Sequence, residues 1–109
     1  MGVTKTEVYS PEQLRLAAFC KALGHPARIA IVQRLLREDC CICKDFSEDI
    51  ELSQPTISRH LEQLHAAGII TGTVKGTTRS FCLNPTVLSQ VTLLIHALTG
   101  ESGPNAGCC

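Results

Sequence analysis

The order of hydrophobic and polar residues along the chain predicts five helices and one β-hairpin. Apolar residues recur at the three- and four-residue spacing of helices in segments that begin near residues 11, 26, 54 and 85. A shorter helix is expected at 42–50. The segments 69–74 and 78–83 flank Lys75-Gly76-Thr77, and this pattern predicts a hairpin.

Residues that favour helix ends mark several of these boundaries. Ser10 precedes Pro11 and is followed by Gln13, a combination that can form a capping box at the start of the first helix. Ser53 is expected to cap the fourth helix, which should end at Ala66-Ala67-Gly68.

This order of elements is that of a winged helix-turn-helix domain, mainly α with a β-hairpin wing. We expect one such domain at 10–99, a flexible N-terminus at 1–9 and a flexible tail at 100–109. The first helix is apolar on more than one side, which predicts contact with a second subunit as well as with its own core.

Composition limits the class of protein. The chain has 109 residues, a formal net charge of zero and seven cysteines. It begins with no export signal and contains no segment long and apolar enough to span a bilayer, so a cytoplasmic location with no membrane partner is expected. In that setting, clustered thiols favour redox chemistry or metal binding over a structural disulfide framework.

One face of the fourth helix is predicted to read DNA. If Ile57, Leu61 and Leu64 form its buried stripe, polar residues face outward, and three bases but only one acid lie between 53 and 79. An exposed polar face alone can simply be solvated, but the short preceding helix and the wing favour a DNA reader. The outward residues are Gln54, Pro55, Ser58, Arg59 and Glu62.

Three stretches resemble the ArsR–SmtB family of bacterial repressors: Ala22 to Ile29, Ser53 to Leu61, and Ala67 to Ile70. The resemblance implies a homodimer joined through the first and last helices, bound to double-stranded operator DNA and released by an inducer. Carried over to matching positions, it implies DNA contacts from Ser53, Gln54, Thr56, Ser58, Arg59 and His60, with Lys75, Thr77 and Arg79 in the wing.

The sequence Cys40-Cys41-Ile42-Cys43 is the candidate inducer site. Neighbouring Cα atoms lie about 3.8 Å apart, less than the roughly 4.4–6.8 Å usual for disulfides, so a Cys40–Cys41 bond would be strained and readily reduced. The start of the third helix, with Lys44 and Arg37 nearby, would favour a thiolate there. Peroxide could oxidise that thiolate to a sulfenic acid, which the adjacent thiol would trap as a disulfide.

The adjacent cysteines resemble those of a redox-responsive member of the family, with Cys43 as a supporting thiol. The preferred prediction is therefore a repressor that binds its operator when reduced, responds to peroxide through Cys40 and Cys41, and is restored by a cellular thiol reductant. It needs no cofactor or metal. No Cys-x-x-Cys on a βαβ pattern and no nucleophile–base pair can be identified, so the chain is not expected to be an enzyme.

The alternative is a repressor induced by trivalent arsenic or another soft metal. Its ligands would be either Cys40, Cys41 and Cys43 or Cys82, Cys108 and Cys109. The arsenite pattern Cys-x-Cys-x-x-Cys has Phe46 in its third position here. Cys20 is expected in the core, and Cys82 is expected to face away from it.

Overall fold

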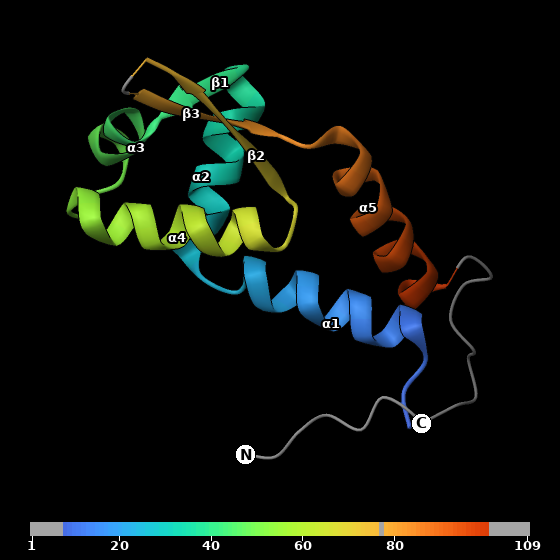
Figure 1. Ribbon diagram of the computed structural model, residues 1–109. Coiled ribbons are helices and arrows are strands. Elements are labelled where there is room, and N and C mark those ends of the chain that lie inside the picture. The colour runs from blue at the N-terminus through green and yellow to red at the C-terminus, as the bar shows by residue number, and fades with distance from the viewer. Residues whose placement is uncertain (1–7, 77, 101–109) are drawn as a thin grey trace.

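The computed structural model describes residues 8–76 and 78–100, and within them it contains five helices and three strands (Figure 1). The elements are α1 (Pro11–Leu23), α2 (Pro26–Arg37), β1 (Cys40–Ile42), α3 (Cys43–Asp49), α4 (Gln54–Ala66), β2 (Ile70–Lys75), β3 (Thr78–Leu83) and α5 (Pro85–Thr99). The predicted flexible segments 1–9 and 100–109 lie almost entirely outside the described residues, as does Thr77. The winged helix-turn-helix fold is confirmed.

The wing contains one more strand than the sequence predicts. The hairpin of β2 and β3 places Gly72 opposite Phe81, and β1 pairs with the other edge of β3, giving the antiparallel order β1–β3–β2. In the second pairing Cys40 lies opposite Cys82 and Cys41 lies opposite Phe81. The strand β1 therefore connects the end of α2 to the wing before the chain enters α3.

The predicted helix ends are confirmed. Ser10 Oγ accepts the N–H of Gln13 at 3.1 Å, and Gln13 Oε1 accepts the N–H of Ser10 at 2.9 Å, which completes the capping box. Gly68 follows α4 with φ of 80°, a left-handed conformation that glycine adopts without steric cost.

The core lies between the helices and the inner face of the sheet. Ile57, Leu61 and Leu64 of α4 are at most 1% exposed, which confirms the predicted buried stripe, and they pack in one cluster with Ile31 and Phe46. Burial of such side chains typically contributes about 1.5–3 kcal/mol each. The prediction for Cys20 is wrong, because this residue is exposed on α1 of the subunit.

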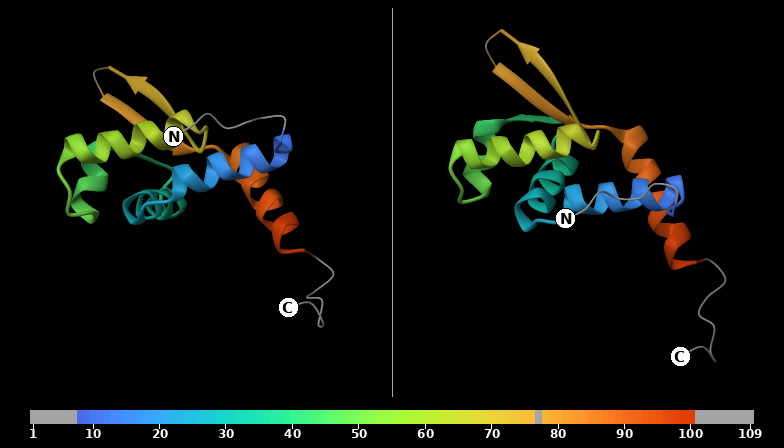
Figure 2. Two further views of the ribbon diagram at one scale, coloured as in Figure 1. Left: turned by 90° about the horizontal axis from the view of Figure 1, so that it is seen from below. Right: turned by 60° about the horizontal axis from the view of Figure 1, so that its bottom comes forward.

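The helices and the wing occupy different ends of the subunit. Helices α1 and α5 pack against each other at one end, and the β2–β3 hairpin extends away from the helical body at the other (Figures 1 and 2). Helix α4 lies between α1 and the wing. Among the helices of the described ranges, none has the length and apolarity needed to cross a membrane.

Candidate nucleic-acid interface and thiol pair

Helix α4 presents a polar face to solvent. Gln54, Ser58 and Arg59 are exposed, as predicted, on the side opposite its buried stripe. The side chains of Ser53 and Thr56 cap the start of the helix. Ser53 Oγ accepts the N–H of Thr56 at 3.4 Å and lies 2.9 Å from Thr56 Oγ1. The face therefore offers amide, hydroxyl and guanidinium groups, the kinds of side chain that contact base edges and phosphates.

A groove of about 330 Å³ separates this face from the wing. Its walls include Gln54, Ser58 and Glu62 of α4 and Thr78 and Arg79 of β3. Residues predicted as contacts from two separate segments thus come to one side of the subunit. Lys75 ends β2, and Thr77 lies outside the described residues.

His60 was predicted as a DNA contact, but its side chain points inward and is only 9% exposed. Its Nδ1 accepts a hydrogen bond from Arg28 Nε at 3.1 Å, and its ring lies 4.4 Å from that of His25. Burial, followed by the charges of His25 and Arg28, lowers the pKa of His60. We therefore correct this assignment: His60 holds α4 against α2 and is not available for a direct contact.

The structure also corrects the predicted Cys40–Cys41 disulfide, because Cys40 is bonded to Cys82 across β1 and β3. The Cα atoms of this pair are 4.5 Å apart, within the usual range for disulfides. Successive side chains on a strand point to opposite faces, so Cys40 and Cys82 meet on the outer face while Cys41 points into the core. The expected outward direction of Cys82 is confirmed.

The other two cysteines of the cluster are not activated thiols. Cys41 is 2% exposed, and burial raises its pKa despite the opposing charge of Arg34. Burial also raises the pKa of Cys43, whose Sγ donates to the carbonyl of Gln54 at 3.6 Å. Both effects disfavour the thiolate, which is the reactive form.

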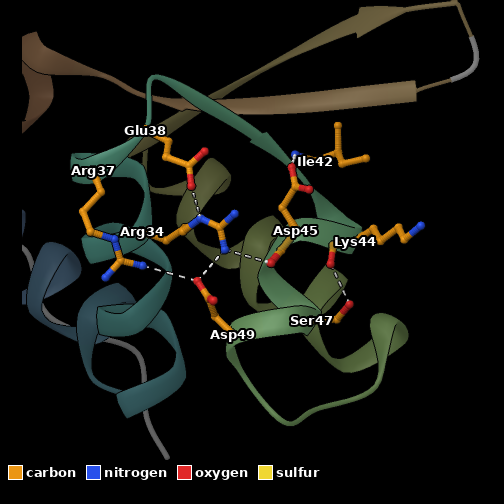
Figure 3. Close-up of polar contacts among 8 residues, drawn as sticks. All are labelled: Arg34, Arg37, Glu38, Ile42, Lys44, Asp45, Ser47 and Asp49. Atoms are coloured by element: carbon orange, nitrogen blue, oxygen red, sulfur yellow. Dashed lines mark hydrogen bonds and ion pairs between the residues drawn. The ribbon is translucent and has the colours of Figure 1, made fainter.

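The basic residue that organises this region is Arg34, which the sequence reasoning did not identify. Its guanidinium contacts the carboxylate of Asp49, the carboxylate of Glu38 at 2.7 Å and the carbonyl of Asp45 at 3.1 Å (Figure 3). The Asp45 carboxylate also accepts the N–H of Ile42 at 2.9 Å. Arg34 of α2 thus holds both the first and the last turn of α3.

The two basic residues predicted to support a thiolate have other roles. Arg37 pairs with Asp49 at 3.3 Å, and Lys44 is exposed, with its carbonyl accepting from Ser47 Oγ at 2.8 Å (Figure 3). Neither forms a described contact with a thiol.

Cys40, Cys41 and Cys43 do not converge on one point. Cys40 is bonded to Cys82, Cys41 lies in the core, and Cys43 faces Gln54. Within residues 8–76 and 78–100, no three cysteine, histidine or acidic residues are grouped to hold a metal ion. Cys108 and Cys109 lie outside this part of the chain.

The proteins that this chain resembles in sequence are helix-turn-helix transcriptional regulators. Residues 25–71 match the helix-turn-helix domain described as "Bacterial regulatory protein, arsR family". The HTH-type transcriptional repressor SmtB of Mycobacterium tuberculosis is 35% identical over 81 residues, covering 74% of this chain and 59% of its own length. The arsenic resistance transcriptional regulator ArsR1 of Pseudomonas putida is 37% identical over 79 residues, covering 72% of this chain and 61% of its own length. The chain thus spans about three fifths of the length of these relatives.

Other relatives match over more of their length. An uncharacterized HTH-type transcriptional regulator of Methanocaldococcus jannaschii is 34% identical over 86 residues, covering 77% of this chain and 94% of its own. A solved structure of reduced HlyU from Vibrio cholerae superposes with a TM-score of 0.64 at 26% identity, covering 82% of this chain and 93% of that one. Fold and relatives are those of transcriptional regulators rather than enzymes. The chain belongs to the ArsR–SmtB family of bacterial regulatory proteins.

Proposed function

We propose that this protein is a homodimeric repressor that binds operator DNA when Cys40 and Cys82 are reduced and releases it when they form a disulfide. The observation that carries the proposal is the bond between these two cysteines, because it joins the strand that leads into α3 to the strand that forms the wing.

The DNA-binding part of the proposal rests on the shared side of α4 and the wing. Gln54, Ser58 and Arg59 are exposed, and Arg79 lies across the groove from Gln54 and Ser58. In a helix-turn-helix protein, the second helix enters the major groove, and residues near its N-terminal end reach the base edges. A wing beside that helix is suited to the adjacent phosphates.

The homodimer part rests on the apolar surface of α5. Leu93 is 67% exposed and Leu98 is 72% exposed in the subunit, and Leu16 of α1 lies beside Leu98 in a cavity of about 250 Å³ between the two helices. Large exposed apolar side chains grouped on one element mark an interaction surface. A second copy of the same surface would bury them and place two α4 helices for two half-sites.

The chemistry follows from the positions of the two thiols. Cys40 is exposed and Cys82 is half-buried, so we assign Cys40 as the first to react with peroxide. Its thiolate attacks one peroxide oxygen, the O–O bond breaks, and a sulfenic acid and hydroxide form; the hydroxide takes up the proton that the thiol released and becomes water. The Cys82 thiol then attacks the sulfenic sulfur, the S–S bond forms, the S–O bond breaks, and a second water leaves. Two thiols lose two electrons, and peroxide becomes two waters.

The Cys40–Cys82 bond links the redox state of the protein to the DNA-binding surface formed by α4 and the wing. It fixes β1 to β3, and β1 continues directly into α3, which contacts α4. When reduced, β1 is held to β3 by backbone hydrogen bonds and by core packing of Cys41 and Phe81, without a covalent link, so the wing and α3 can adjust as the two half-sites are engaged. A cellular dithiol would restore this state by thiol–disulfide exchange.

The test is operator affinity measured by fluorescence anisotropy, with duplexes selected from a random-sequence pool by the reduced protein. We expect peroxide to lower the affinity of the wild type by roughly 5- to 150-fold, a typical range for coupled sites. Cys40→Ser and Cys82→Ser should bind in both conditions.

Cys20→Ser is the control, because this exposed thiol lies on α1, away from the pair, and should leave the response intact. Loss of DNA on peroxide treatment by both Cys40→Ser and Cys82→Ser would show that the pair is not the sensor.

A second candidate function is induction by trivalent arsenic. When reduced, Cys40 and Cys82 place two thiols side by side, and relatives include an arsenic resistance regulator. A cysteine of the tail, Cys108 or Cys109, could supply a third thiolate. Intact mass separates the two functions: loss of two hydrogens after peroxide supports the redox switch, and a stoichiometric arsenic adduct after arsenite supports this one.

A further inference from the structure

The side chain of Arg79 lies flat across the neighbouring strand, over Gly72. A Cβ atom built on Gly72 would be 2.5 Å from Arg79 Nε, 2.8 Å from Nη2 and 3.0 Å from Cζ. These distances are too short for any side chain to coexist with this position of the guanidinium. Gly72 therefore provides the space that Arg79 occupies.

Two further contacts hold the guanidinium there. Its Cζ lies 5.0 Å from the centre of the Phe81 ring, a cation–π distance, and Phe81 is itself part of the core. Its Nη2 lies 3.4 Å from Nε2 of His65, in the last turn of α4. Arg79 thus connects β2, β3 and the C-terminal end of α4.

We propose that Gly72, Arg79 and His65 form a clasp that sets the angle of the wing relative to α4, and that Arg79 is a positioning residue for DNA binding. The inference rests on the operator-binding function proposed above. The hairpin extends away from the helical body, so a small rotation at its base moves its tip by a larger distance (Figure 2). The clasp acts between that base and the tip, where Gly72 lies opposite Phe81, and it restrains such a rotation by tying the hairpin to the C-terminal end of α4.

A clasp and a simple phosphate contact predict different results for Arg79→Lys. Lysine keeps the charge but lacks the planar guanidinium that lies over glycine and stacks on phenylalanine. If Arg79 only neutralised a phosphate, lysine would largely replace it.

A double-mutant cycle tests the clasp. We expect Gly72→Ala, Arg79→Ala and Arg79→Lys each to lower affinity for the selected duplex by roughly five- to thirtyfold. In the Arg79→Ala background, Gly72→Ala should have no further effect, because the atoms it would strike are gone. Thr73→Ala, on the adjacent outward-facing position of β2, is the control and should bind normally.

A second measurement does not depend on DNA. Amide hydrogen exchange across β2 and β3 should be faster in Gly72→Ala than in the wild type. The double variant Gly72→Ala/Arg79→Ala should exchange at the same rate as Arg79→Ala alone. If the wild type selects no duplex, the repressor function fails while this measurement still tests the clasp. Equal effects of Gly72→Ala in both backgrounds, or full binding by Arg79→Lys, would overturn it.

Discussion

Arg28 donates a hydrogen bond from Nε to Nδ1 of His60 across 3.1 Å, and this contact joins α2 to α4. The same guanidinium donates from Nη1 to the carbonyl of Ala22 at 3.1 Å, at the end of α1. Three helices are therefore connected through the guanidinium of Arg28. The Nδ1 of His60 can accept this bond only while it carries no proton.

The first prediction concerns pH. The folded protein lowers the pKa of His60, so the unfolded chain binds the proton more readily, near pH 6.5. Stability should therefore be fully present above about pH 6.5 and should fall as pH decreases below it. Urea denaturation at a series of pH values measures this. His60→Gln should remove this part of the pH dependence, and exposed His96→Gln should retain it; equal pH dependence in wild type and His60→Gln would contradict the assignment.

The second prediction concerns the contacts that hold α3. Arg34→Met should lower the free energy of unfolding more than Arg37→Met does, since it leaves the Asp45 carbonyl and the Glu38 carboxylate without this donor and leaves Asp49 with Arg37 alone. Arg37→Met is a matched control, because this side chain is 66% exposed and has one ion pair, worth less than about 1 kcal/mol. Urea denaturation of both variants makes the comparison. Similar losses would show that Arg34 has no special role.

The third prediction separates Cys41 from the redox pair. Cys41→Ser should cost about 1–3 kcal/mol of stability, because it places a hydroxyl in the core. It should still form the Cys40–Cys82 bond after peroxide, as seen by peptide mapping without reductant. If Cys41→Ser is folded by circular dichroism but does not form the Cys40–Cys82 bond, Cys41 takes part in the redox reaction.

The fourth prediction concerns the dimer. Leu93→Glu and Leu98→Glu should each shift the protein from dimer to monomer, measured by light scattering after size-exclusion chromatography, because charges are costly in an apolar interface. Leu36→Glu is the control: this leucine is 68% exposed on α2 and should leave the dimer intact. A dimer that survives both changes on α5 would place the interface on another surface.

Local patterns predicted most of the fold. The Ser10 capping box, the Gly68 helix end and the stripe of Ile57, Leu61 and Leu64 depend on residues close in sequence, and the structure confirms all three. Strand β1 could not be predicted in this way. It has three residues, and its partner β3 is about forty positions away, so its pairing depends on tertiary contact.

The candidate site was predicted less completely for the same reason. Adjacency of Cys40 and Cys41 indicated thiol chemistry but not the partner, which depends on a strand register that local spacing does not contain. His60 occupies a position expected to contact DNA, yet Arg28, 32 residues earlier, holds it inside. Exposure of Gln54, Ser58 and Arg59 followed from helical periodicity and was predicted correctly.

The bond between Cys40 and Cys82 has a topological consequence. It closes a loop with a sequence separation of 42 residues, and all of α3, α4 and β2 lie within it. The oxidised chain is thus a covalent macrocycle that contains the helix-turn-helix of α3 and α4 and most of the β2–β3 hairpin. Helices α1, α2 and α5 lie outside the ring as linear segments. A protease cut anywhere inside the ring would leave the two fragments attached until a reductant opens it.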